Sequence, residues 1–146
     1  MACCAALAAL ALAGCGGSSS RGLTKAQLAG RANALCSAYA RAAILIPAPI
    51  DFATNASAAA AYLDKAEPLV ATEKNGMLAL KPDSGAKMLW DQFTAAGLHI
   101  TRLFDDARAK AHAGQSALTD IEQAAIYKRS TLIPLASQLG APACAR

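Results

Sequence analysis

The side chains best suited to acid–base or metal chemistry in this chain are its two histidines, His99 and His112. They lie thirteen positions apart, which corresponds to about 220° around a helix, so they cannot share a ligand site on one face. Neither belongs to an H-E-x-x-H arrangement. The histidines alone therefore predict no metal centre.

Carboxylates form two pairs that would suit general acid–base catalysis if both members of a pair faced one pocket. Asp105 and Asp106 are adjacent, whereas Asp64 and Glu67 are spaced i, i+3 and share a helix face. Basic residues are interspersed with them, so we interpret both pairs as a solvated surface of ion pairs. A buried pocket that gathered two or more of the polar candidates would instead favour an enzyme. These candidates are His99, Asp105, Asp106, Asp64, Glu67 and Lys128.

Gly97-Leu98-His99 resembles the start of the G-x-H-x-x-E motif of imelysin-like periplasmic helical proteins, a group linked to iron. Arg102 occupies the position of the motif's glutamate and puts a cation where the group has an anionic ligand. The sequence therefore assigns no catalytic, metal-binding or cofactor-binding residue.

The most specific motif is Leu12-Ala13-Gly14-Cys15, which closes an apolar run over residues 5–13. The run is too short to cross a bilayer and is typical of the apolar core of a signal peptide. The motif resembles the lipobox of bacterial lipoproteins. This resemblance implies that residues 1–14 are removed as a signal peptide. It also implies that Cys15 becomes the first residue and is acylated with diacylglycerol and with fatty acids such as palmitate.

An acylated Cys15 would anchor the protein, because two or three acyl chains hold a protein stably on a membrane. We therefore expect a cell-envelope protein on the extracytoplasmic face of the membrane. Residues 15–22 would form the lipidated cysteine and a flexible tether, since Gly-Gly-Ser-Ser-Ser occupies 16–20. Residues 1–4 lack the basic charge usual in a signal peptide, so we expect the natural start to lie upstream. The alternative is an alanine-rich N-terminal helix with an incidental cysteine.

The five cysteines lead to a prediction of one disulfide. Cys3 and Cys4 would leave with the signal peptide and Cys15 would carry lipid, so Cys36 and Cys144 remain. An even pair in an oxidising compartment predicts a bond between them. The loop that it closes exceeds 100 residues, and chain-entropy models assign such a loop about 4–5 kcal/mol. The alternative is two unrelated thiols.

Alanine dominates a composition that is 55% apolar and only 5% aromatic. Alanine favours helices and β-branched residues are sparse, so we expect an all-α domain over residues 23–146. Apolar residues recur at helical spacing in four segments, which predicts an antiparallel four-helix bundle, up-down-up-down, with one disulfide. The expected helices begin at Thr24, near Asn55 or Ser57, at Asp83 or Ser84, and near Ser116 or Thr119. They end before Pro47, at Asn75-Gly76 or toward Lys81, at Ala113, and at Gly140.

Three residues conflict with the helical pattern. Pro68 and Pro134 fall inside the second and fourth helices, where a proline removes a hydrogen bond and predicts a kink or break. Lys128 falls on the apolar seam of the fourth helix, from which its stem can carry the charge to the rim. Together these residues could open a pocket inside the bundle. Capping boxes, by contrast, support the helix starts at Thr24 with Gln27 and at Thr119 with Glu122.

The motifs of the whole chain resemble a broad group of uncharacterised, alanine-rich lipoproteins of high-GC bacteria. The shared features are the lipobox, the polar spacer, a first helix opening with Leu-Thr-Lys-Ala that carries a cysteine, an internal Leu-Lys-Pro turn and a terminal Leu-Gly-x-x-x-Cys. This resemblance implies anchoring and a small helical domain. It implies no activity.

The charge pattern argues against nucleic acid as a partner, because the net charge is only +4 and the basic residues are scattered. We expect a non-catalytic binding or scaffolding module, held to the membrane through Cys15. Its partner would be an envelope protein, an envelope polymer or an apolar ligand. The alternative is an envelope enzyme or a metal- or small-ligand-handling helical protein, with a site formed only in three dimensions.

Overall fold

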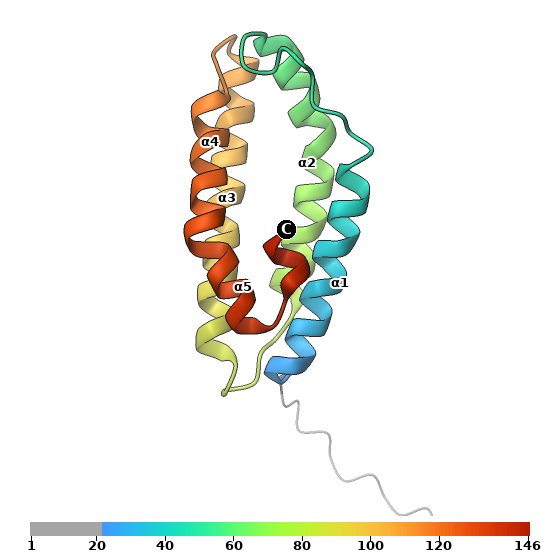
Figure 1. The fold of residues 1–146 in the computed structure, drawn as a ribbon, viewed down its shortest axis with the longest axis vertical. Helices are drawn as coiled ribbons and strands as arrows, with labels where there is room; N and C mark the ends of the chain where they lie inside the picture. The colour runs from blue at the N-terminus through green and yellow to red at the C-terminus, as the bar shows by residue number, and fades with distance from the viewer. Residues whose placement is uncertain (1–21) are drawn as a thin grey trace, which may run out of the picture.

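The computed structural model describes residues 22–146. The predicted signal peptide, the predicted lipobox with Cys15 and most of the predicted tether lie outside these residues. The described part is helical (Figure 1). Its elements are α1 (Lys25–Ala43), α2 (Ala56–Ala79), α3 (Lys87–His112), α4 (Leu118–Tyr127), the π-helical turn η1 (Lys128–Leu132), α5 (Ile133–Leu139) and the 3₁₀ turn η2 (Pro142–Ala145).

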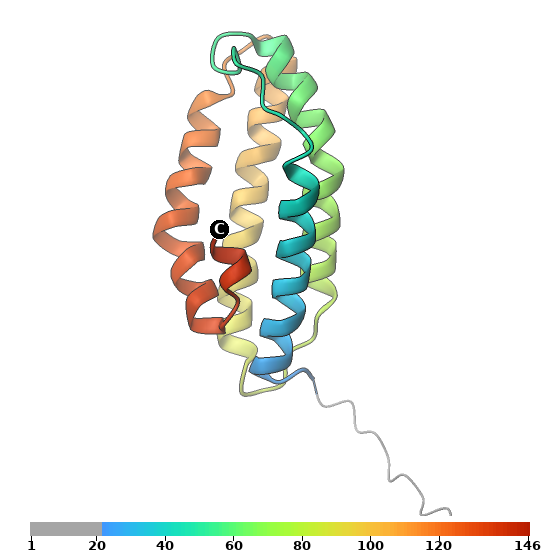
Figure 2. The ribbon, with the colours of Figure 1, turned by 45° about the vertical axis from the view of Figure 1, so that its right-hand side comes forward.

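The helices of residues 22–146 pack as a four-helix bundle in which α4, η1 and α5 together form the fourth rod. The chain path in Figure 1 ascends α1, descends α2, ascends α3 and descends the fourth rod. Helix α2 packs against both α1 and α3, and α3 packs against α4. Figures 1 and 2 show η2 folded back into the space between α1 and α5, and it contacts both of them. The expected all-α bundle is confirmed.

Helix α1 begins as the sequence predicts. The Thr24 hydroxyl accepts from the backbone N–H of Gln27 at 3.4 Å, and the Gln27 side chain accepts from the Thr24 N–H at 3.0 Å. The residue before this box is also fixed. Leu23 donates to the Lys81 carbonyl at 2.7 Å and accepts from the Asp83 N–H at 2.9 Å. The start of the folded domain is therefore held against the α2–α3 turn.

Helix α2 ends at Ala79, in agreement with the second of the two ends that the sequence leaves open. Asn55 caps it as predicted, but the helix continues through Pro68 without a break. It also passes through Gly76, so a C-cap at Asn75-Gly76 is wrong. A Cβ at Gly76 would come within 2.7 Å of a methyl carbon of Leu35. This glycine therefore permits the close approach of α1 and α2 rather than ending a helix.

Helix α4 begins at Leu118, between the two predicted starts near Ser116 and Thr119, but without the predicted cap. Thr119 lies inside the helix, where Ala117 is the capping residue and makes no side-chain cap, so the expected Thr119–Glu122 box is wrong. The helix starts earlier because Ala117 is buried, and because Asp120 in the first turn is buried beside Lys110. Both Asp120 oxygens lie within 2.8 Å of the Lys110 Nζ. An acidic group in the first turn also suits the helix dipole.

The irregularity expected at Pro134 takes the form of the π-turn η1 directly before it. The Ile133 N–H donates to the carbonyl of Lys128, five residues earlier. Proline has no N–H to continue the ordinary ladder, and a widened turn is one way in which helices accommodate such a site. Gly140 then ends α5 with φ of +84°, a left-handed conformation that favours glycine.

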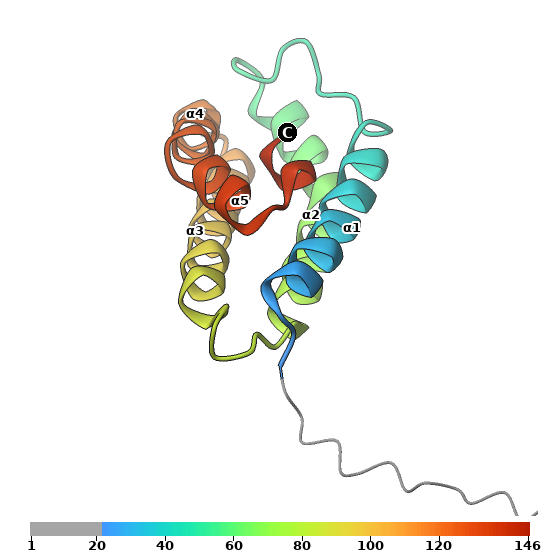
Figure 3. The same ribbon diagram turned by 60° about the horizontal axis from the view of Figure 1, so that its bottom comes forward.

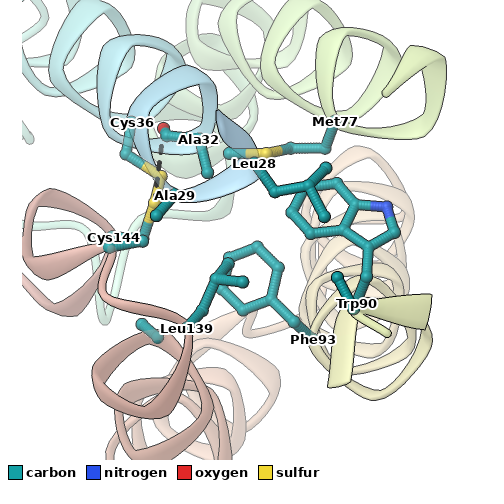
Figure 4. Close-up of a cluster of buried hydrophobic side chains, with 12 residues drawn as sticks. Leu28, Ala29, Ala32, Cys36, Met77, Trp90, Phe93, Leu139 and Cys144 are labelled. Atoms are coloured by element: carbon teal, nitrogen blue, oxygen red, sulfur yellow. Dashed lines mark hydrogen bonds between the residues drawn. A yellow bond between two sulfur atoms is a disulfide. The ribbon is translucent and has the colours of Figure 1, made fainter. Parts of the chain in front are cut away.

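Two separate groups of buried side chains fill the bundle. The first, called the disulfide cluster, lies toward the end where residue 22 enters, and Figure 4 shows the disulfide on one side of it and Trp90 on the other. Its buried members are Leu28, Ala29, Ala32, Cys36, Met77, Ala86, Trp90, Phe93, Ala136, Leu139, Ala141 and Cys144. The second, called the alanine cluster, joins α2, α3 and the start of α4. Its buried members are Ala59, Ala60, Leu63, Ala107, Ala111 and Ala117.

The predicted disulfide joins Cys36 to Cys144, with Cα atoms 5.1 Å apart. Cys144 belongs to the terminal segment, residues 141–146. Asn33, which lies one turn before Cys36 on α1, also binds this segment. Its side-chain oxygen accepts from the Ala143 N–H at 2.8 Å, and its amide nitrogen donates to the Gly140 carbonyl at 3.3 Å. Figure 3 shows the segment seated between α5 and α1. The disulfide and Asn33 together therefore attach the end of the chain to its first helix.

Replacing both Cys36 and Cys144 by serine is expected to lower the free energy of unfolding by up to about 4–5 kcal/mol, because the bond closes a very long loop. Chemical denaturation of the two proteins, each with and without a reductant, measures the effect. The reductant should lower the midpoint of the natural protein and leave the double variant unchanged. An equal midpoint for the oxidised natural protein and the double variant would contradict a stabilising role.

Candidate functional site

A pocket of about 290 Å³, partly open to solvent, lies between the helices of the bundle and between the two clusters. Met77, Phe93 and the disulfide bound it on one side, and Phe104, which packs against the alanine cluster, bounds it on the other. Side chains of α1, α2, α3, η1 and the terminal segment all contribute to its wall. A water molecule occupies about 30 Å³ of liquid, so the volume corresponds to roughly ten water-sized groups. It is close to the lower end of the range for small-molecule sites, about 300–1,000 Å³.

Most of the pocket wall is apolar. The main apolar side chains are Val70, Met77, Phe93, Ile100, Phe104 and Leu132. Thr94 and Thr101 also line it, but their hydroxyls donate to carbonyls of their own helix, at 2.9 Å and 3.1 Å. Neither hydroxyl proton is therefore available for a ligand. The pocket suits a compact apolar group better than a sugar or another strongly polar molecule.

The pocket exists because three seam positions lack a large apolar side chain. Glu73 follows Val70 by three residues and precedes Met77 by four, so a carboxyl group stands in the apolar seam of α2. Gly97 has no side chain, and a Cβ built there would meet no atom within 4 Å. Lys128, on η1, occupies the corresponding part of the fourth rod. The bundle is therefore unfilled at this level.

Charged side chains form the polar part of the wall. Glu73 is half-buried, and this burial raises the pKa of its carboxyl group, although the charge of Lys128 acts in the opposite direction. Tyr39 faces the same space from α1. Burial raises the pKa of its hydroxyl, and the neighbouring Glu73 and Tyr62 add to the effect. Lys74 and Arg146 complete the group.

Lys128 is half-buried, and its ammonium group donates to the main-chain carbonyl oxygen of Arg146. An ammonium has three protons to donate. This bond uses one of them, and the other two have no acceptor among residues 22–146. Lys128 interrupts the apolar seam of the fourth helix in the sequence, and in the structure it places a charged group at the pocket.

Of the six polar candidates from the sequence, Lys128 alone lines this pocket. His99 is half-buried and packs against Tyr127, with ring centres 4.3 Å apart and the rings tilted by 55°. Asp105 and Asp106 are exposed. The structure therefore does not gather two of the candidates there.

Asp64 joins α2 to α3 instead. Its Oδ1 lies 2.6 Å from Arg108 Nε and 3.0 Å from His112 Nε2. The hydrogen bonds from His112 and Arg108 lower the pKa of the Asp64 carboxyl. All three side chains are well exposed, so Asp64 forms solvated ion pairs of the kind that the carboxylate pattern predicts. Among residues 22–146, Glu67, Asp105 and Asp106 form no ion pair.

Sequence reasoning missed Tyr39 and Glu73 as pocket residues, and Asn33 as the residue that holds the terminal segment. For Glu73 a signal existed, because a carboxyl group at the correct spacing between Val70 and Met77 breaks an apolar seam. For Asn33 and Tyr39 the role depends on the terminal segment and on α2, which are distant in the sequence. Such roles become visible only in three dimensions.

Comparison of the chain with models of protein families, with curated proteins and with solved structures finds no match. Within residues 22–146, no three His, Cys, Asp or Glu side chains come together as a candidate metal site. By length and hydropathy, none of the helices in the same residues could span a bilayer.

Replacing Glu73 by glutamine is expected to stabilise the protein at neutral pH. Since burial raises the pKa of Glu73 in the folded state, the folded protein holds this proton more tightly than the unfolded chain. Its contribution is therefore complete below the unfolded pKa and is lost as the pH rises through the folded pKa. The advantage of the glutamine variant over the natural protein should therefore grow as the pH rises above the unfolded pKa of a glutamate, about 4.3.

Denaturant unfolding at several pH values measures this gain. Glu122→Gln, which removes an exposed carboxyl group of α4, is the matched control. An advantage for Glu73→Gln that stayed constant or shrank as the pH rose would contradict the burial of this carboxyl group.

Proposed function

We propose that this protein is a lipid-anchored lipoprotein of the cell envelope, which binds a small apolar or amphipathic molecule in the pocket and catalyses no reaction. The observation that carries the proposal is the pocket itself, with an apolar wall drawn from all four rods. Pockets between the helices of bundles are a common place for small ligands. The lipobox resemblance at Cys15 supports the anchor.

Binding accounts for the pocket better than scaffolding does. A scaffold acts through its surface and needs no interior space. Unfilled apolar space forfeits dispersion contacts between the side chains around it. Gly97 and Glu73 keep this space open at a cost in packing, and a ligand that occupies it would restore the lost contacts.

The attachment of Leu23 to the α2–α3 turn gives the anchored domain a defined end. A lipid on Cys15 would hold that end nearest to the membrane. Residues 16–22 span at most about 25 Å when extended, at roughly 3.5 Å per residue. A ligand that leaves the bilayer would therefore have only a short distance to travel to the pocket.

The alternative function, an envelope enzyme, would use Glu73 as a general acid or base. A carboxyl group with a raised pKa in an apolar pocket is suited to that role. Among the described residues, however, Glu73 is the single carboxylate side chain that lines the pocket. Turnover lost in Glu73→Gln, with ligand binding retained, would favour the enzyme over the binding protein.

Filling the pocket from Gly97 tests the binding function. The Gly97→Leu variant places a side chain in open space, so it should keep its fold and gain about 0.5–1 kcal/mol from removing a helical glycine. Binding of 1-decanol, measured by isothermal titration calorimetry, should fall at least tenfold. Gly30→Leu is the matched control, since Gly30 is an exposed glycine of α1 that also has open space and does not line the pocket.

The natural protein and Gly30→Leu should bind 1-decanol equally, with a negative change in heat capacity. Equal binding by Gly97→Leu would place the ligand elsewhere on the protein. An absence of binding to the natural protein by 1-decanol and by the charged ligands discussed below would contradict the binding function.

Replacing Cys15 by serine tests the anchor. Expressed in a bacterium that processes lipoproteins, the variant should lose incorporation of labelled palmitate and move from the membrane fraction to the soluble fraction. Cys4→Ser, in the predicted signal peptide, should leave both readouts unchanged. Membrane association that persists in Cys15→Ser without label would show that the protein is held by another means.

A further inference from the structure

The side chains around the pocket carry an excess of positive charge. Lys74, Lys128 and Arg146 each contribute a cation, and the single opposing carboxylate side chain is that of Glu73. The cations come from three elements, α2, η1 and the terminal segment, so they converge on the pocket from different sides. An anionic ligand matches this distribution by charge complementarity.

Lys128 is the cation best placed to bind such a ligand. It lies on the π-turn, and π-turns within α-helices are frequently found at functional sites. Its ammonium group already donates to the main-chain oxygen of Arg146, at the edge of the pocket. Two further protons remain for the oxygens of a ligand, and a charge-assisted bond of this kind is about twice as strong as a neutral one.

The shape of the pocket restricts what accompanies the anionic group. The wall beyond Lys128 is formed by apolar side chains such as Leu132, Ile100 and Phe104. The volume of about 290 Å³ accommodates one short chain and is too small for a two-chain lipid. A single apolar tail with a small charged head fits both the size and the distribution of polarity.

We infer that the ligand is a single-chain amphiphile with a small anionic head, such as a carboxylate, held by the Lys128 ammonium while its tail lies between the two clusters. This inference rests on the proposed binding function and adds the chemical class of the ligand. Glu73 lies beside the head and, when protonated, can donate a hydrogen bond to it. Lys128 therefore acts as the residue that selects the head group.

Three ligands of equal chain length test this inference, namely decanoate, 1-decanol and decylammonium. Calorimetric titration of the natural protein should give decanoate a Kd at least tenfold lower than that of 1-decanol, and decylammonium should bind most weakly. In Lys128→Met the advantage of decanoate over 1-decanol should disappear while 1-decanol still binds. Lys128→Gln, which retains a polar group, serves as a second variant if the methionine variant unfolds. Arg129→Met, which removes the exposed neighbouring cation, should keep the full preference.

The outcomes distinguish a failure of this inference from a failure of the proposed binding function. If 1-decanol and decanoate bind the natural protein equally, the pocket binds ligands but the choice of an anionic head is wrong. A preference for decylammonium would mean that Glu73 selects the head group instead. If none of the three ligands binds, the proposed function itself fails. A preference for decanoate that survives in both Lys128 variants would overturn the role of Lys128.

Discussion

The covalent bond between Cys36 and Cys144 is the constraint on which the rest of this structure depends. It holds the terminal segment against α1, and the segment in turn contacts α5. The terminal segment thereby adds to the direct contacts between α1 and α5 in joining the first and fourth rods of the bundle. Asn33 adds two hydrogen bonds to the same segment. The bond also forms part of the pocket wall, so the element that closes the bundle also shapes its site.

The distribution of side-chain sizes along the bundle explains why a pocket occurs at this level. Trp90 and Phe93 fill the disulfide cluster with large rings, whose centres lie 5.5 Å apart. At the other end, small alanines allow α2, α3 and α4 to approach closely. Glu73, Gly97 and Lys128 lie between the two clusters. Their side chains neither fill the space there nor allow the helices to approach closely enough to close it. The proposed binding site is thus the part of the bundle where the side chains do not fill the core.

Features that depend on local chemistry could be predicted from the sequence. The Thr24 cap is an example, because its partner lies three residues away, and the disulfide followed from counting cysteines once Cys15 was assigned to lipid. Features that depend on packing between helices could not be predicted from the sequence. Gly76 has the local character of a helix end, yet its role is set by Leu35 on another helix. Lys128 was visible as a conflict on its seam, whereas its pocket required the positions of four other segments.

The most direct test of this account is a crystal structure of the protein with 10-bromodecanoate, in which bromine marks the end of the tail by anomalous scattering. The account predicts a bromine peak inside the pocket, near Phe104, and a carboxylate within hydrogen-bonding distance of the Lys128 Nζ. A bromine peak confined to another surface, such as the exposed apolar loop at Ile44 and Leu45, would contradict it.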